Sequence, residues 1–76
     1  MTQSTARQTI NNWLLGVGLA TLDPGLSDLD FANGLRRAIA ERVGKTPELF
    51  EQAEPAAAWI AEMGASVGKM TSYMAR

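Results

Sequence analysis

The sequence contains no cysteine and no histidine. Without cysteine the chain forms no disulfide, and without either residue it lacks the usual ligands of zinc. Histidine is also the commonest general base, and cysteine is the most reactive nucleophile, so catalysis is hard to build from the side chains that remain. We therefore expect a protein that is not an enzyme, with no catalytic or metal-binding residues, no cofactor and no small-molecule ligand.

Acidic residues gather at one place, but they do not change this expectation. Asp28 and Asp30 follow Ser27 at a predicted helix start, where capping and the helix dipole account for carboxylates. Asp23 lies nearby, yet the spacing of the three differs from that of a calcium-binding EF-hand loop. The cluster therefore predicts a helix boundary rather than a metal or catalytic site.

Net charge is also nearly absent, because seven basic and eight acidic residues are mixed along the chain and leave a formal charge of −1. Such a chain exerts no long-range attraction on polyanions.

The apolar stretch at residues 11–25, NNWLLGVGLATLDPG, is too short to span a bilayer. It also lacks the small-residue cleavage site of a secretory signal. We expect no membrane span and a cytoplasmic location, which the lack of cysteine suits, although proteins without cysteine also occur outside the cytoplasm.

What the chain does have is enough apolar residues for one small core. Of its 76 residues 46% are hydrophobic, but twelve of these are alanines, so the bulk comes mainly from leucines, four methionines and five aromatic residues. We predict a single domain over residues 1–76. Domains of this size often gain stability from disulfides, metals or association, and only association is open to this chain. Folding alone is the equally weighted alternative.

Helical spacing of apolar residues predicts the first two helices. The first has Ser4 as N-cap and ends at Asp23-Pro24-Gly25, where proline and glycine interrupt a helix. Its apolar stripe consists of Ala6, Ile10, Trp13, Leu14 and Val17. The second runs from about Asp28 to Val43, with Ser27 as N-cap and Gly44 as C-cap.

The remaining chain predicts one short helix and one long helix. Thr46 and Pro47 are typical of a helix start, and Pro55 either ends that short helix or begins the next one. The long helix after it carries a core-facing stripe of Trp59, Ile60, Met63, Val67, Met70 and Met74. The fold class that follows is all-α, a small bundle of three principal helices plus one short helix.

Residues 36–54 resemble a helix-turn-helix motif, with Ala40, Val43, Gly44 and Phe50 at the positions of its core and turn residues. Under this alternative the protein is a DNA-binding regulator that uses Arg36, Arg37, Arg42, Lys45 and Gln52. The segment TPELFEQAEP argues against DNA, because it contains three glutamates and no basic residue, whereas base reading depends on basic and amide side chains.

The leading hypothesis rests on GASVG, residues 64–68, where two glycines four residues apart allow a close helix approach. We expect the alanine- and glycine-rich flank of this helix to contact a second copy or another protein. Its candidate residues are Ala57, Ala61, Gly64, Ala65 and Gly68. The function predicted from the sequence is a small non-catalytic protein-interaction module, an accessory subunit or modulator of a larger complex.

Overall fold

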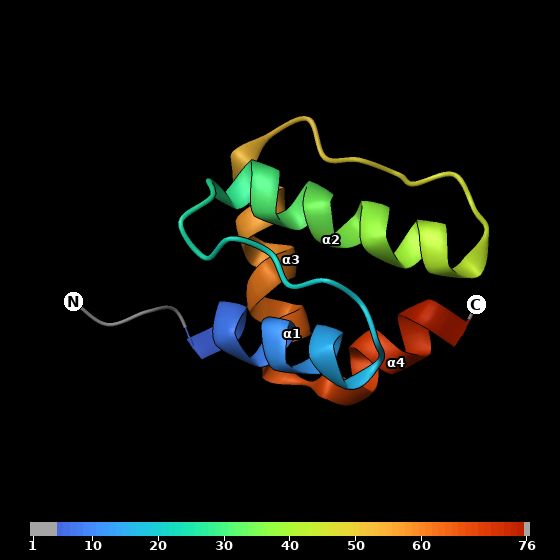
Figure 1. The fold of residues 1–76 in the computed structure, drawn as a ribbon. Coiled ribbons are helices and arrows are strands. Elements are labelled where there is room, and N and C mark those ends of the chain that lie inside the picture. Colours follow the sequence, from blue (N-terminus) through green and yellow to red (C-terminus); the bar gives the residue numbers. More distant parts are fainter. Residues whose placement is uncertain (1–4, 76) are drawn as a thin grey trace.

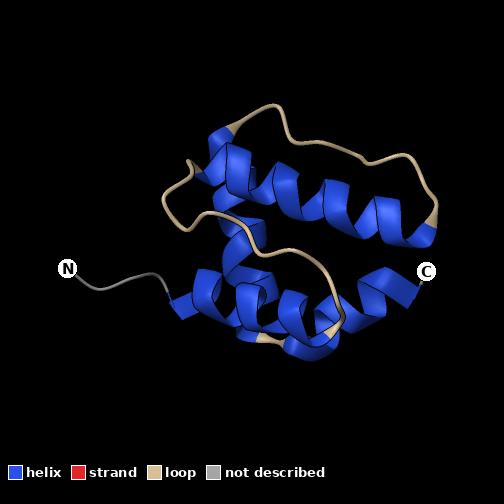
Figure 2. Ribbon diagram, in the orientation of Figure 1, coloured by secondary structure: helices blue, strands red, loops and turns tan. Residues whose placement is uncertain are grey.

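The computed structural model describes residues 5–75, and in this range the chain forms four α-helices and no strand. They are α1 (Thr5–Gly16), α2 (Asp28–Val43), α3 (Ala53–Ala65) and α4 (Val67–Ala75). α3 lies behind α1 and α2 in Figure 1 and packs against both, while the shorter α4 contacts all three. Figure 2 shows that two long loops join α1 to α2 and α2 to α3. The predicted all-α bundle is confirmed, and its short helix is the last one.

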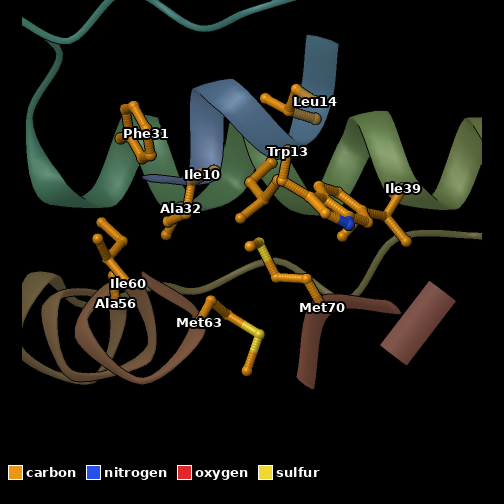
Figure 3. Close-up of a cluster of buried hydrophobic side chains, with 11 residues drawn as sticks. Ile10, Trp13, Leu14, Phe31, Ala32, Ile39, Ala56, Ile60, Met63 and Met70 are labelled. Atoms are coloured by element: carbon orange, nitrogen blue, oxygen red, sulfur yellow. The ribbon is translucent and has the colours of Figure 1, made fainter. Parts of the chain in front are cut away.

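The core lies where the four helices meet, and every helix contributes side chains to it (Figure 3). The residues of the central cluster are Ile10, Trp13 and Leu14 from α1, Phe31, Ala32, Leu35 and Ile39 from α2, Ala56, Ile60 and Met63 from α3, and Met70 from α4. Because the helices are short, no pair of them encloses this core alone, and the fold depends on all four.

α1 ends at Gly16, well before the predicted end at Asp23. The helix closes with a Schellman motif, in which Gly18 has a left-handed φ of 81° and the Leu19 N–H donates to the Leu14 carbonyl at 2.8 Å. Gly18 therefore serves to stop the helix, and residues 17–27 are free to cross the molecule as a loop (Figure 1). The N-cap predicted at Ser4 lies outside the described residues.

α2 has the predicted bounds and both predicted caps. The Ser27 hydroxyl accepts a hydrogen bond from the Asp30 N–H at 3.1 Å. Gly44 adopts a left-handed φ of 72°, and the Lys45 N–H donates to the Ala40 carbonyl at 2.8 Å, which completes a second Schellman motif. Both signals are local in sequence, which is why they could be read without knowledge of the fold.

Residues 45–52 form an extended loop along α2, so the helix predicted over this segment is wrong. Asn33 holds the backbone of Phe50 at both of its polar groups: the side-chain amide donates to the carbonyl at 3.1 Å and accepts from the N–H at 2.7 Å. Arg36 donates to the Glu48 carbonyl at 2.7 Å. These tertiary bonds satisfy backbone groups that a helix would have used, and so short a helix is marginal by itself.

The chain after Pro55 forms two helices where the sequence predicts one, because the backbone is extended at Ser66 (φ −149°, ψ 108°). Pro55 lies in the first turn of α3, in agreement with the alternative in which it begins a helix. After the break Met70 is fully buried, whereas Val67 is 46% exposed and does not belong to the predicted inner face. The other members of that face lie at least partly in the core: Trp59, Ile60, Met63 and Met74.

Candidate interaction surface

The five residues predicted to meet a partner do not lie on one surface. Gly64 faces α1, because a Cβ added there would overlap the Cα and Cβ of Ala6 and lie 2.9 Å from the Ala6 carbonyl oxygen. Ala57 is partly buried and lies two turns earlier on the same side of α3. These two residues allow α1 and α3 to approach closely within one chain. The close contact predicted for Gly64 is therefore intramolecular.

Ala61, Ala65 and Gly68 are exposed. Helical spacing places Ala61 and Ala65 on the side of α3 opposite its buried residues, together with other exposed side chains. We call this surface the outer face of α3, and it consists of Glu54, Ala58, Ala61, Glu62 and Ala65. Its apolar centre is bordered by the carboxylates of Glu54 and Glu62. Val67 begins α4 after the break at Ser66 and is 46% exposed.

The basic residues predicted for the DNA-binding alternative have different surroundings. Arg36 and Arg42 each donate to a loop carbonyl at 2.7 Å, Arg36 to Glu48 and Arg42 to Val17. The other three predicted residues are exposed: Arg37, Lys45 and Gln52. Because residues 45–52 form no helix, the second helix of a helix-turn-helix is missing from its expected place. The resemblance ends at the turn, whereas DNA binding through these residues has not been tested and stays a prediction.

Arg36 is the centre of an aromatic cluster that the sequence did not reveal. Its guanidinium carbon lies 4.0 Å from the ring centre of Phe50, 4.6 Å from that of Trp59 and 5.8 Å from that of Tyr73. Trp59 also packs against the other two rings, at centroid distances of 5.5 Å and 5.7 Å. The sequence does indicate that Arg36 lies near the core, since it follows Leu35 at the edge of the buried face of α2. The partners come from three other segments, which no local pattern connects.

Two surface pockets lie on either side of Tyr73. One has a volume of about 210 Å³ and lies between α2, the start of the following loop and Tyr73, with Arg36 and Lys45 among its lining residues. The other, of about 340 Å³, lies between α3 and α4 and has Glu62 and Lys69 at its edge, joined by an ion pair at 3.8 Å. Tyr73 thus lines both pockets, the first together with Arg36, Lys45 and Glu48 and the second together with Glu62 and Lys69.

The acidic cluster at the start of α2 has structural partners. Asp28 accepts a hydrogen bond from Arg7 at 2.6 Å, and the Asp23 carboxylate accepts from the Gly25 N–H at 2.8 Å. Within residues 5–75, carboxylates come together nowhere in groups of three or more that could hold a metal ion. No helix in the same range is long and apolar enough to cross a membrane.

Comparisons with protein-family models, curated proteins and solved structures find no match to this chain. The function has to be inferred from the chain's own residues. Three features carry chemistry for that purpose: the outer face of α3, the Arg36 cluster and the pocket between α2 and Tyr73.

Proposed function

We propose that this chain is a small non-catalytic protein-interaction module that acts as an accessory subunit or modulator of a larger protein complex. Its contact surface is the outer face of α3, and the partner is another protein or a second copy of the chain. The observation that carries the proposal is the exposure of Ala61 and Ala65 on α3. Val67, the first residue of α4, is also exposed, at 46%. Burying such an apolar surface on a partner is favourable.

The chemistry of this surface supports a helical partner. The side chains of Ala58, Ala61 and Ala65 are short, so a second helix can approach α3 closely along this side. Glu54 and Glu62 provide the polar rim that surrounds the apolar centre of many interfaces. A partner with an apolar helix stripe bordered by lysine or arginine is complementary to this surface in both shape and charge.

The test replaces the apolar centre by charge without disturbing the fold. Ala61→Arg combined with Ala65→Arg places two long cations on exposed positions of a helix, and arginine is a good helix former. Ala20→Arg is the matched control, since Ala20 is equally an exposed alanine but lies in the loop between α1 and α2. Tagged full-length chains are used to capture partners from the organism's extract. A partner retained by the wild type and the control but lost from the double variant supports the proposal.

Self-association is tested with the same three chains. Light scattering over a range of protein concentrations is expected to show either a wild-type dimer that the double variant abolishes or a monomer that requires a foreign partner. If the double variant retains every partner and the same mass as the wild type, the outer face of α3 is not the contact surface.

The DNA-binding alternative and the cellular location are tested separately. A mobility-shift assay on genomic fragments is expected to show no specific band, and a specific band that bulk DNA competes poorly would replace our proposal by the regulator. The cytoplasmic location predicted from the sequence remains part of the proposal, and fractionation of cells that express the full-length chain tests it.

A further inference from the structure

A single residue forms the bend between α3 and α4. Ser66 has an extended backbone (φ −149°, ψ 108°), while α3 ends at Ala65 and α4 begins at Val67. The bend turns the nine residues of α4 back onto the other three helices. The position of α4 therefore depends on the conformation of one residue.

Nothing in the local sequence requires a bend at Ser66. Residues 64–68 contain no proline, and the spacing of apolar residues predicts one helix through them. In residues 5–75 the glycines with a left-handed φ are Gly18 and Gly44, which follow α1 and α2. A bend also separates two helix ends, whose backbone groups would pair with one another in a continuous helix. Local backbone bonding therefore favours a straight helix through Ser66.

Contacts with the core hold α4 in its bent position. Met70 is fully buried and reaches into the core from α4 (Figure 3). The indole Nε1 of Trp13 donates to the Thr71 hydroxyl at 3.4 Å, and the Tyr73 ring packs against Trp59 with 5.7 Å between ring centres. The surface that receives α4 is formed by α1, α2 and α3. What fits this surface is therefore known, because α4 itself occupies it.

We propose that two copies of this chain exchange α4. In the exchanged dimer Ser66 is helical, α3 and α4 form one straight helix, and the α4 of each copy packs on the core of the other. A second copy is the fitting occupant, because its α4 has the same residues and makes the same contacts. The exchange is reciprocal, so both cores are complete and the difference from the monomer is concentrated at the two hinges. Short hinges between elements favour such swapping.

The exchange is a separate property from the proposed function, because the outer face of α3 takes no part in it. The hinge follows that face in sequence, and the exchanged contacts are those of Met70, Thr71 and Tyr73 on α4. Association in this form also supplies a small domain with support that neither disulfides nor zinc can give it.

The experiment compares full-length chains refolded from urea at micromolar and at millimolar concentration. Light scattering after size-exclusion chromatography measures the dimer. The wild type is expected to form it at millimolar concentration, because the exchange requires two chains to meet while α4 is released.

Val67→Pro fixes the bent form and is expected to weaken the dimer at least about hundredfold. Proline is favoured at the first position of a helix such as α4, and it favours an extended backbone at the residue before it, which Ser66 already has. In a continuous helix the same proline removes a hydrogen bond and clashes with the preceding turn. Val67→Ala is the matched control, because it shortens the same exposed side chain, keeps the N–H and is expected to dimerise like the wild type.

Ser66→Ala changes the hinge in the opposite direction. Alanine is the better helix former and lacks the hydroxyl with which serine caps a helix, and the dimer contains two hinges. The variant is therefore expected to strengthen the dimer about tenfold. It keeps the proposal testable if Val67→Pro fails to fold, which circular dichroism shows.

A nuclear Overhauser experiment distinguishes the exchange from any other dimer. Chains labelled with heavy nitrogen and chains labelled with heavy carbon are refolded together, and the dimer is isolated. The contact between the Trp13 indole N–H and the Thr71 side chain is expected between differently labelled chains. In a dimer formed through the outer face of α3 this contact stays within one chain, so failure of the exchange and failure of the proposed function are distinguishable.

Any of three results overturns the exchange. The first is the absence of a dimer from both the wild type and Ser66→Ala after refolding at millimolar concentration. The second is a folded Val67→Pro variant that dimerises as strongly as Val67→Ala. The third is a dimer in which the contact between Trp13 and Thr71 is found only within single chains.

Discussion

At the scale of single residues, Asn11 and Asn33 have the same structural role. Each binds the backbone of a distant loop residue through both the N–H and the oxygen of its side-chain amide. Asn11 on α1 donates to the Leu22 carbonyl at 2.9 Å and accepts from the Leu22 N–H at 2.8 Å. Asn33 on α2 makes the equivalent pair with Phe50. An amide side chain can thus satisfy a loop residue as a neighbouring strand would.

Asn33→Ala is expected to lower the free energy of unfolding by about 2 kcal/mol, because it leaves the N–H and carbonyl of Phe50 without partners. Urea denaturation followed by circular dichroism measures the loss. Asn12→Ala is the matched control, since Asn12 is an exposed helical asparagine, and its effect is expected to stay within about 0.5 kcal/mol. Equal stability of the two variants would show that the hydrogen bonds of Asn33 to Phe50 contribute nothing to the free energy of unfolding.

Gly64 and Gly68 give a second pair of variants with opposite expectations. Gly64→Ala places a Cβ against Ala6 and is expected to cost about 1–3 kcal/mol, although alanine is the better helix former. Gly68→Ala meets only the Ser66 hydroxyl at 3.6 Å and is expected to raise stability by up to about 1 kcal/mol.

Thermal melts at two protein concentrations check both glycine variants. The loss in Gly64→Ala is expected at both concentrations, because the contact lies within one chain. A loss that shrinks as the concentration rises would instead place Gly64 at an interface between chains.

At the scale of elements, the ends of α1 and α2 obey the same rule. Each helix is followed by a glycine in the left-handed region, Gly18 or Gly44, and by the backbone bonds of a Schellman motif. The residues that carry this rule lie within six positions of one another. The sequence predicts the cap of α2 at Gly44, whereas the helix predicted at the N-terminus continues past Gly18 to the proline and glycine at residues 24 and 25.

Gly44→Ala is expected to destabilise the protein by about 1 kcal/mol, since a side chain disfavours a φ of 72°. Gly16→Ala provides the control, because Gly16 is helical and a Cβ there has no atom within 4 Å. That variant is expected to be as stable as the wild type or slightly more stable. The urea midpoint of Gly44→Ala should therefore fall below the wild-type value and that of Gly16→Ala at or above it, and a destabilised Gly16→Ala would contradict the assignment of the helix end.

At the scale of the whole molecule, the aromatic cluster joins segments that are remote in sequence. Arg36 lies on α2, Phe50 on the following loop, Trp59 on α3 and Tyr73 on α4. Trp59 touches both other rings and the guanidinium, so the arrangement of three helices and a loop depends on its side chain.

Trp59→Ala is expected to reduce the free energy of unfolding by about 2–4 kcal/mol. This loss is smaller than that for a fully buried ring, because Trp59 is only partly buried. Trp59→Phe is the conservative control and is expected to keep most of the stability, since a ring still fills the space. Urea denaturation and the NMR signals of α4 report the effect. Near-wild-type melting of Trp59→Ala would place the ring outside the stabilising core.

The sequence by itself determined the all-α class, the bounds and caps of α2 and most of the core residues of α1 and α3. These features depend on spacing and capping within a few residues, so local patterns reveal them. The sequence also pointed to small residues at a close helix approach, and Gly64 makes one.

Three features were decided only by the tertiary structure. They are the residue that Gly64 contacts, the path of the loop at residues 45–52, and the contacts of Arg36 with the loop backbone and the aromatic rings. The approach at Gly64 is to Ala6, and the loop is extended because Asn33 and Arg36 bind its backbone. In each case the two partners lie twelve or more residues apart. Such pairings compete with local helix propensity through bonds and packing that exist only after the chain has folded, and for that reason no local pattern contains them.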